Sequence, residues 1–171
     1  MADPIYLLEF VIQMYDYNDW ANRRYLAVAV GLPPGQLFHD YAQSWGSVYK
    51  VLAHVLNSEW IWLQRWQGVS PKAFPAEADS PTVDALRLRW SNHEGEMRRF
   101  IATQTPSSLM RDVPYTTTKG VSYTLKLWQM MVHVCNHGTH HRGELAAMFA
   151  MQGIPHPEED WLLYFLERSG Q

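Results

Sequence analysis

The chain has 171 residues, 14 Lys and Arg against 17 Asp and Glu, a net charge of −3 and one cysteine. This length predicts a single domain, residues 1–171, which buries about 70% of its unfolded surface and needs no metal or disulfide merely to fold. The charge pattern argues against nucleic-acid binding. No apolar run approaches the roughly 18 residues of a membrane helix. A lone Cys135 and no secretory leader at the start indicate a soluble protein of the reducing cytoplasm.

The first half of the chain predicts two long helices. Apolar residues recur at three- and four-residue steps from Ile5 to Val30, and Gly31 with the prolines that follow ends that helix. The same spacing returns between Ser44, a candidate N-cap, and Trp66. The Pro- and Gly-punctuated residues 67–79 predict a long irregular crossover.

The second half predicts two more long helices. Ser80 and Pro81 are typical of a helix start, and an apolar stripe continues to Ile101. Residues 110–124 predict a short β-hairpin around Lys119-Gly120, and residues 125–151 the fourth long helix. A short terminal helix is expected over residues 161–166. We therefore predict an all-α four-helix bundle with a hairpin-like insertion before its fourth helix.

Four histidines fall within nine residues of the fourth predicted helix: His133, His137, His140 and His141. At 100° per residue, His133, His141 and Glu144 lie within about 40° of His137, and His140 within about 60°. Two histidines at positions i and i+4 can bind one metal ion. Spacing alone does not choose between the pairs His133/His137 and His137/His141. The inward apolar stripe passes through the second pair, and we predict a metal site.

A third ligand is expected from another helix, because catalytic zinc commonly takes three protein ligands and a water. His54 borders the apolar seam of the second helix and is the natural candidate, with His93 on the third helix as its competitor. Cys135 points away from His137 and is expected to be a small buried hydrophobe. Gly138 stands where a zinc protease helix has its glutamate, and the chain has no Glu-x-x-His pair of a di-iron bundle.

The run Asn136-His-Gly-Thr-His-His-Arg-Gly-Glu144 resembles the Asn-His-x-x-His-His-Arg-Gly-Gln signature of the DinB/YfiT-like superfamily of metal-dependent enzymes. Tyr17-Asn-Asp-Trp-Ala-Asn22 and Leu52-Ala-His-Val55 resemble weaker parts of the same pattern. The resemblance covers nearly the whole chain and implies a four-helix bundle with His54, His137 and His141 as metal ligands. It favours His141 over His133, and His54 over His93.

The resemblance also implies a function. Relatives are assigned zinc or nickel and include transferases that use low-molecular-weight thiols, and maleylpyruvate isomerases. We expect a metal-dependent enzyme, transferase-like or hydrolase-like, that activates a thiol or water nucleophile for a small-molecule substrate. Glu144 departs from the motif's glutamine, and could orient a ligand or act as a base. A homodimer is implied, which gel filtration tests.

Two other interpretations compete with an enzyme. One is a stress-related protein that holds metal without turnover, for which a fourth protein ligand such as His133 or His93 would be expected. The other is a metal-free helical dimer with hydrogen-bonded histidines. Helix faces make Asn18, Trp20 and Trp62 candidate pocket walls. Arg142 could bind an anionic substrate, although a surface salt bridge is the simpler interpretation.

Overall fold

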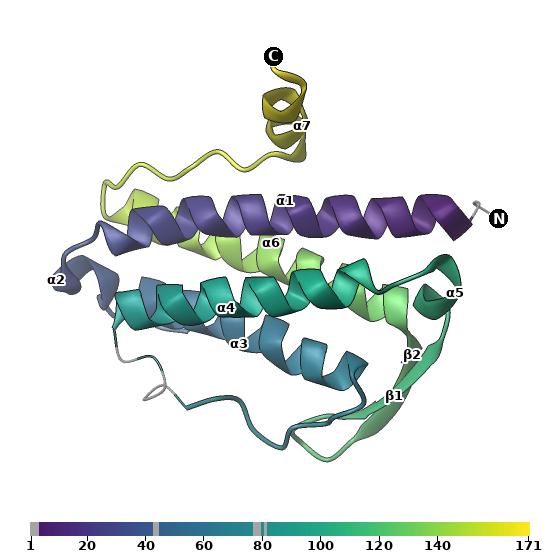
Figure 1. Ribbon diagram of the computed structural model, residues 1–171. Helices are drawn as coiled ribbons and strands as arrows, with labels where there is room; N and C mark the ends of the chain where they lie inside the picture. Colours follow the sequence, from purple (N-terminus) through teal and green to yellow (C-terminus); the bar gives the residue numbers. More distant parts are fainter. Residues whose placement is uncertain (1–3, 43–44, 77–79, 81) are drawn as a thin grey trace.

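A computed structural model describes residues 4–42, 45–76, 80 and 82–171. Four long helices form the bundle in Figure 1: α1 (Pro4–Val30), α3 (Val48–Trp66), α4 (Val83–Ala102) and α6 (Leu127–Met151). Both α1 and α3 pack against α4 and against α6. The predicted all-α bundle is confirmed, and the predicted long helices agree with the observed ones to within a few residues.

Smaller elements connect and cover these helices. The hairpin pairs β1 (Asp112–Thr116) with β2 (Ser122–Lys126) in antiparallel register, Val113 opposite Leu125. Gly120 turns between the strands at a φ of 79°, a conformation that favours glycine. Short helices α2 (Pro34–Leu37) and α5 (Pro106–Leu109) were not predicted, while α7 (Trp161–Ser169) lies above α1. No described helix is long and apolar enough to cross a membrane.

Two predicted helix caps differ from the structure. Ser47 caps α3 by accepting a hydrogen bond from the backbone amide of Lys50, whereas the predicted cap, Ser44, lies outside the described residues. Thr82 caps α4, whereas Ser80 is buried before the helix and Pro81 is not described. Both segments offer two hydroxyl residues within a few positions, and only the path of the folded chain decides which one caps.

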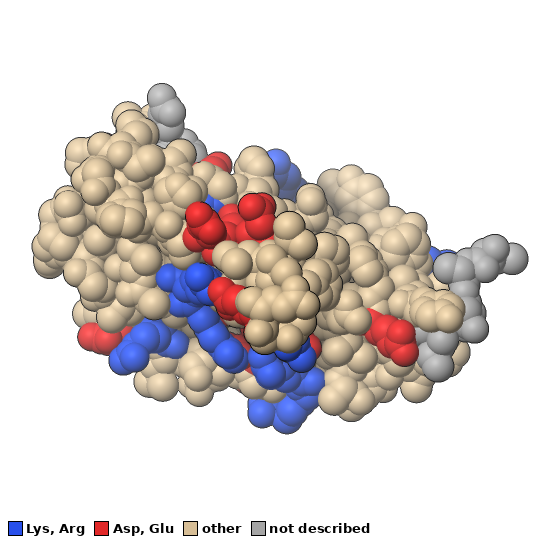
Figure 2. All heavy atoms as spheres, turned by 90° about the horizontal axis from the view of Figure 1, so that it is seen from above, with Lys and Arg blue, Asp and Glu red and all other residues tan. Residues whose placement is uncertain are grey.

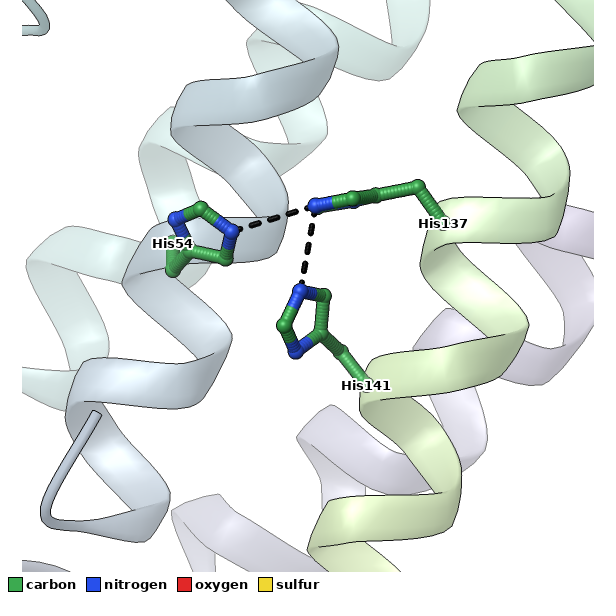
Figure 3. A group of neighbouring side chains, drawn as sticks. All are labelled: His54, His137 and His141. Atoms are coloured by element: carbon green, nitrogen blue, oxygen red, sulfur yellow. Dashed lines mark hydrogen bonds between the residues drawn. The ribbon is translucent and has the colours of Figure 1, made fainter. Parts of the chain in front are cut away.

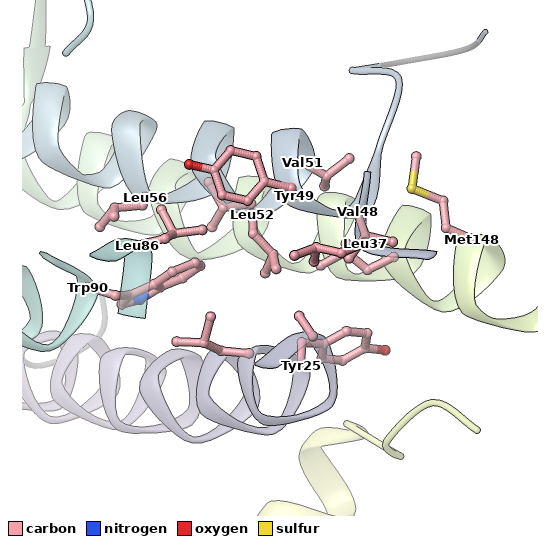
Figure 4. Packing of buried hydrophobic residues seen from close by; sticks show 14 of the residues in the cluster. Tyr25, Leu37, Val48, Tyr49, Val51, Leu52, Leu56, Leu86, Trp90 and Met148 are labelled. Atoms are coloured by element: carbon pink, nitrogen blue, oxygen red, sulfur yellow. The ribbon is translucent and has the colours of Figure 1, made fainter. Parts of the chain in front are cut away.

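The apolar core among the four long helices is divided into two halves, and a smaller third cluster of Tyr17, Ala21 and Tyr164 joins α1 to α7. One half, shown in Figure 4, packs Tyr25 of α1, Leu52 and Leu56 of α3, and Trp90 of α4 with Met148 of α6. The other half lies around residues earlier in α1 and α6 and later in α3 and α4, namely Val11, Tyr15, Leu63, Trp66, Met97, Ile101, Met130 and Val134. Between the two halves, each of the four long helices contributes buried polar side chains. We call this set the polar layer: Asn18 and Asn22 of α1, Glu59 of α3, His93 of α4 and Arg142 of α6.

Arg142 lies at the centre of this polar layer and is only 1% exposed. Its Nη1 donates to Oδ1 of Asn18 at 2.9 Å and of Asn22 at 2.8 Å. The Nδ2 groups of both asparagines donate to Oε1 of buried Glu59, at 2.8 and 3.0 Å. The expectation that Arg142 lies at the surface is wrong, although it does form a salt bridge: its Nε donates to Oε2 of partly buried Glu159. Two asparagine amides also join its guanidinium to buried Glu59, so these polar groups have hydrogen-bond partners inside the bundle.

Gly138 allows this network to approach the backbone of α6. A Cβ atom at this position would lie 2.7 Å from Asn18 Oδ1 and 3.0 Å from Arg142 Nη1. Gly143 lies in the same helix, and a Cβ atom added there has no neighbour within 4 Å. The two glycines therefore form a matched pair.

We predict that Gly138→Ala lowers the free energy of unfolding by about 1–3 kcal/mol, because the methyl group displaces hydrogen-bonded side chains. Gly143→Ala should raise it by about 0.5–1 kcal/mol through helix propensity. Urea unfolding followed by circular dichroism measures both. Equal stabilisation by the two substitutions would contradict the close approach at Gly138.

Candidate metal centre

Three histidine side chains converge between α3 and α6. Nε2 of His137 lies 3.1 Å from Nε2 of His54 and 3.0 Å from Nε2 of His141 (Figure 3). The ligand atoms of the three rings all lie within 4.8 Å of one another, so the group can hold a metal ion. His137 and His141 share a face because they are four residues apart, and His54 meets them because α3 packs against α6.

The environment favours neutral rings. Burial, followed by the proximity of His141 and His54, lowers the pKa of His137 to about 3. Burial, followed by the proximity of His141, lowers the pKa of His54 to about 4. Neutral imidazoles keep the lone pairs that a metal ion requires.

Contacts on the outer side of two rings fix their orientation. The Nδ1–H of His141 is positioned to donate to Oε2 of Glu144 at 2.7 Å, which leaves the Nε2 lone pair directed at the other histidines. The indole of Trp45 stacks on His54, with ring centroids 3.8 Å apart and an interplanar angle of 18°. One ring is therefore held by a carboxylate and another by an aromatic face.

Comparisons with known proteins place this chain in a family. A sequence profile described as the DinB family matches residues 1–168. The chain belongs to the DinB family. It is also 26% identical over 167 residues to a protein from Bacillus subtilis (strain 168) described as "Protein DinB", covering 91% of this chain and 94% of that one.

The donor set of this DinB-family chain fits a divalent ion. Ligand nitrogens at 2.0–2.1 Å from a tetrahedral zinc lie about 3.3 Å apart. The separations of 3.1 and 3.0 Å therefore need only a small outward movement of the rings. Among the described residues, no fourth His, Cys, Asp or Glu joins the group.

The other candidates lie elsewhere. His93 is 4% exposed in the polar layer, with Nε2 3.7 Å from Oε2 of Glu59. The ring of His133 packs edge-on against Trp62, with centroids 5.2 Å apart. The side chain of His140 is 70% exposed and its Nε2 lies 3.6 Å from Glu144. Cys135 is buried as expected, and burial raises the pKa of its thiol.

All three residues proposed as pocket walls from helix faces lie away from the histidine group. Asn18 is buried in the polar layer, and Trp20 packs on Tyr164 of α7. Trp62 is separated from the metal-ligand candidates by His133. The aromatic side chains that contact the site are instead Trp45 and Phe74, which come from loops without any periodic signal.

The burial of Glu59 could have been predicted from its position on the apolar face of the second helix. It lies four residues after Val55 and four before Leu63, so the apolar stripe of the second predicted helix runs through it. A carboxylate at such a position is costly unless it is satisfied. The stripe therefore signals a buried polar partner, although it does not say which one.

The lowered histidine pKa values predict acid sensitivity of the metal-free protein. His54 and His93 have pKa values of about 4 and His137 of about 3, below the value of about 6.5 in an unfolded chain. Below pH 6.5 the unfolded chain binds protons that the folded chain does not. The free energy of unfolding should therefore be greatest above pH 6.5 and decrease as the pH falls from 6.5 to 4.

Urea unfolding of chelator-treated protein at a series of pH values measures this slope. His137→Gln should flatten it, whereas the exposed His156→Gln serves as the control and should leave it unchanged. An identical slope in wild type and His137→Gln would contradict a lowered pKa at His137.

Proposed function

We propose that this chain is a metal-dependent enzyme whose His54, His137 and His141 bind a divalent ion, zinc or nickel, through Nε2. The convergence of three imidazoles from two helices carries this proposal. Membership of the DinB family supports it. Without a metal ion, the single Nε2 of His137 would have to serve both His54 and His141 in hydrogen bonds, although a ring nitrogen carries either one proton or one lone pair.

The bound ion would lower the pKa of a thiol or a water molecule at a position that no described protein ligand fills. Three neutral ligands preserve the full charge of the ion for this purpose. A centre with an exchangeable position favours catalysis over metal storage, for which a fourth protein ligand is expected. A low-molecular-weight thiol transferase is therefore our leading proposal, with hydrolysis by activated water as the related alternative.

Glu144 is proposed to orient His141 rather than to act as the base. Its Oε2 is already engaged by Nδ1 of His141, and its Oε1 lies 3.6 Å from Nε2 of exposed His140. A carboxylate in this position raises the basicity of the ligand ring and fixes its tautomer. Glu144 places a carboxylate where the family motif has the amide of glutamine, and it therefore makes His141 a stronger metal ligand.

The surface charges on one face argue against a nucleic-acid partner. On the face shown in Figure 2, Lys and Arg lie next to Asp and Glu. Arg24 pairs with Glu167, and Arg98 pairs with Asp19 on α1. Such alternating signs provide no continuous basic path for a phosphate backbone on this face.

Metal analysis provides the first test. We predict that tag-free protein binds one zinc or nickel ion per chain, and that His137→Ala weakens binding about 100-fold or more, because one of three ligands is lost. His133→Ala, one turn earlier on the same helix, is the matched control and should bind normally. Elemental analysis and calorimetry measure both. A metal-free protein that rejects added zinc and nickel would sink the proposal.

Catalysis is tested with a thiol and an electrophile. Zinc-loaded protein should accelerate the displacement of chloride from chlorodinitrobenzene by cysteine or glutathione, followed by absorbance, and chelation should remove the acceleration.

Glu144→Ala should lower zinc affinity by about 10- to 100-fold, and Glu144→Gln by less, because glutamine keeps an acceptor for His141. If Glu144→Gln binds zinc normally but abolishes turnover, Glu144 is the base instead.

A further inference from the structure

A small hollow lies beside the candidate metal centre, against the ring of His54. It has a volume of about 140 Å³ and is lined by Trp45, Lys50, Ala53, His54, Asn57 and Phe74. Lys50, His54 and Asn57 lie on one face of α3, because they are separated by four and three residues. None of the groups that could hold a metal ion in the described structure includes Trp45, Lys50, Asn57 or Phe74.

The walls of the hollow are aromatic and open to solvent. Trp45 is 46% exposed although it stacks on His54, and Phe74 is 43% exposed with its centroid 6.5 Å from that of His54. Large aromatic side chains left exposed around a polar site are typical of ligand pockets. A dry cavity of about 150 Å³ holds benzene, so the hollow has room for one ring.

The polar groups of the hollow are hydrogen-bond donors. Lys50 is exposed, and its ammonium group forms no ion pair with the residues that the structure describes. Oδ1 of Asn57 accepts a hydrogen bond from Arg89, which leaves the Nδ2 amide as the donor available to the hollow. A cation and an amide donor beside two aromatic rings are complementary to a ring that carries an anionic substituent.

We propose that this hollow is the substrate-recognition subsite of the metal centre and binds a planar apolar ring bearing a carboxylate. The ring packs between Trp45 and Phe74, and the carboxylate accepts from Lys50 and Asn57. The substrate is thereby held against His54, next to the ion that activates the nucleophile. Its catalytic role rests on the proposed function, whereas binding in the hollow does not require the metal.

Fluorine NMR tests the subsite with three probes on chelator-treated and on zinc-loaded protein. The probe para-fluorobenzoate has both ring and charge, para-fluorobenzylamine has the opposite charge, and fluoroacetate lacks the ring. We expect para-fluorobenzoate to bind metal-free protein with a dissociation constant on the order of millimolar, and more tightly than either other probe. No binding at concentrations on the order of 10 mM overturns the proposal.

Variants assign the contacts. Trp45→Ala should weaken para-fluorobenzoate about five- to tenfold in metal-free protein, with Trp45→Phe largely restoring it. Lys50→Gln should weaken it about two- to fivefold and abolish the preference over para-fluorobenzylamine. Phe165→Ala and Lys119→Gln remove a similarly exposed aromatic ring and an exposed lysine elsewhere, and should change nothing.

The outcomes separate this inference from the proposed function. If the probe binds only zinc-loaded protein, and equally well to Trp45→Ala and Lys50→Gln, it coordinates the metal directly and the subsite is refuted while the metal centre stands. If the protein binds no metal but the probe binds with the expected dependence on Trp45 and Lys50, the subsite stands and the metal enzyme does not.

Discussion

A buried arginine and a buried carboxylate, joined through two asparagine amides, determine how the long helices of this protein lie against one another. Arg142, Asn18, Asn22 and Glu59 belong to α6, α1 and α3, and all four are at most 5% exposed. A charge left unpaired at this depth costs several kcal/mol. A displacement of α6 by one turn would separate Arg142 from Asn18 and Asn22, so the polar layer favours one register among those that the apolar halves permit.

The candidate metal centre depends on that register. His141 directly precedes Arg142 and His137 directly precedes Gly138, the glycine that lets Asn18 approach α6. Fixing Arg142 against α1 and α3 therefore also fixes the height at which the histidines of α6 face His54 of α3. On α6, His137, His141 and Arg142 all lie between the two apolar halves, whereas His54 lies beside the first half on α3.

Support around the ligand rings completes this arrangement. Glu144 holds His141 by hydrogen bonding and Trp45 holds His54 by stacking, so both rings are oriented by contacts outside the centre. Orientation by the protein reduces the entropy that metal binding would otherwise cost. Trp45 also has a second role, because its exposed indole lines the hollow beside His54 together with Phe74 and Lys50.

Local patterns were sufficient to predict four long helices, the hairpin, and a histidine-rich face on the last long helix, because periodicity reports direction around one helix axis. The same patterns left His133 and His141 equivalent and assigned Arg142 to the surface, because spacing says nothing about which faces meet. Family resemblance implied His54 as the third ligand, and the structure brings it to His137. The burial of Arg142 and the roles of Trp45 and Phe74 were decided only by tertiary packing, since they depend on contacts between segments distant in sequence.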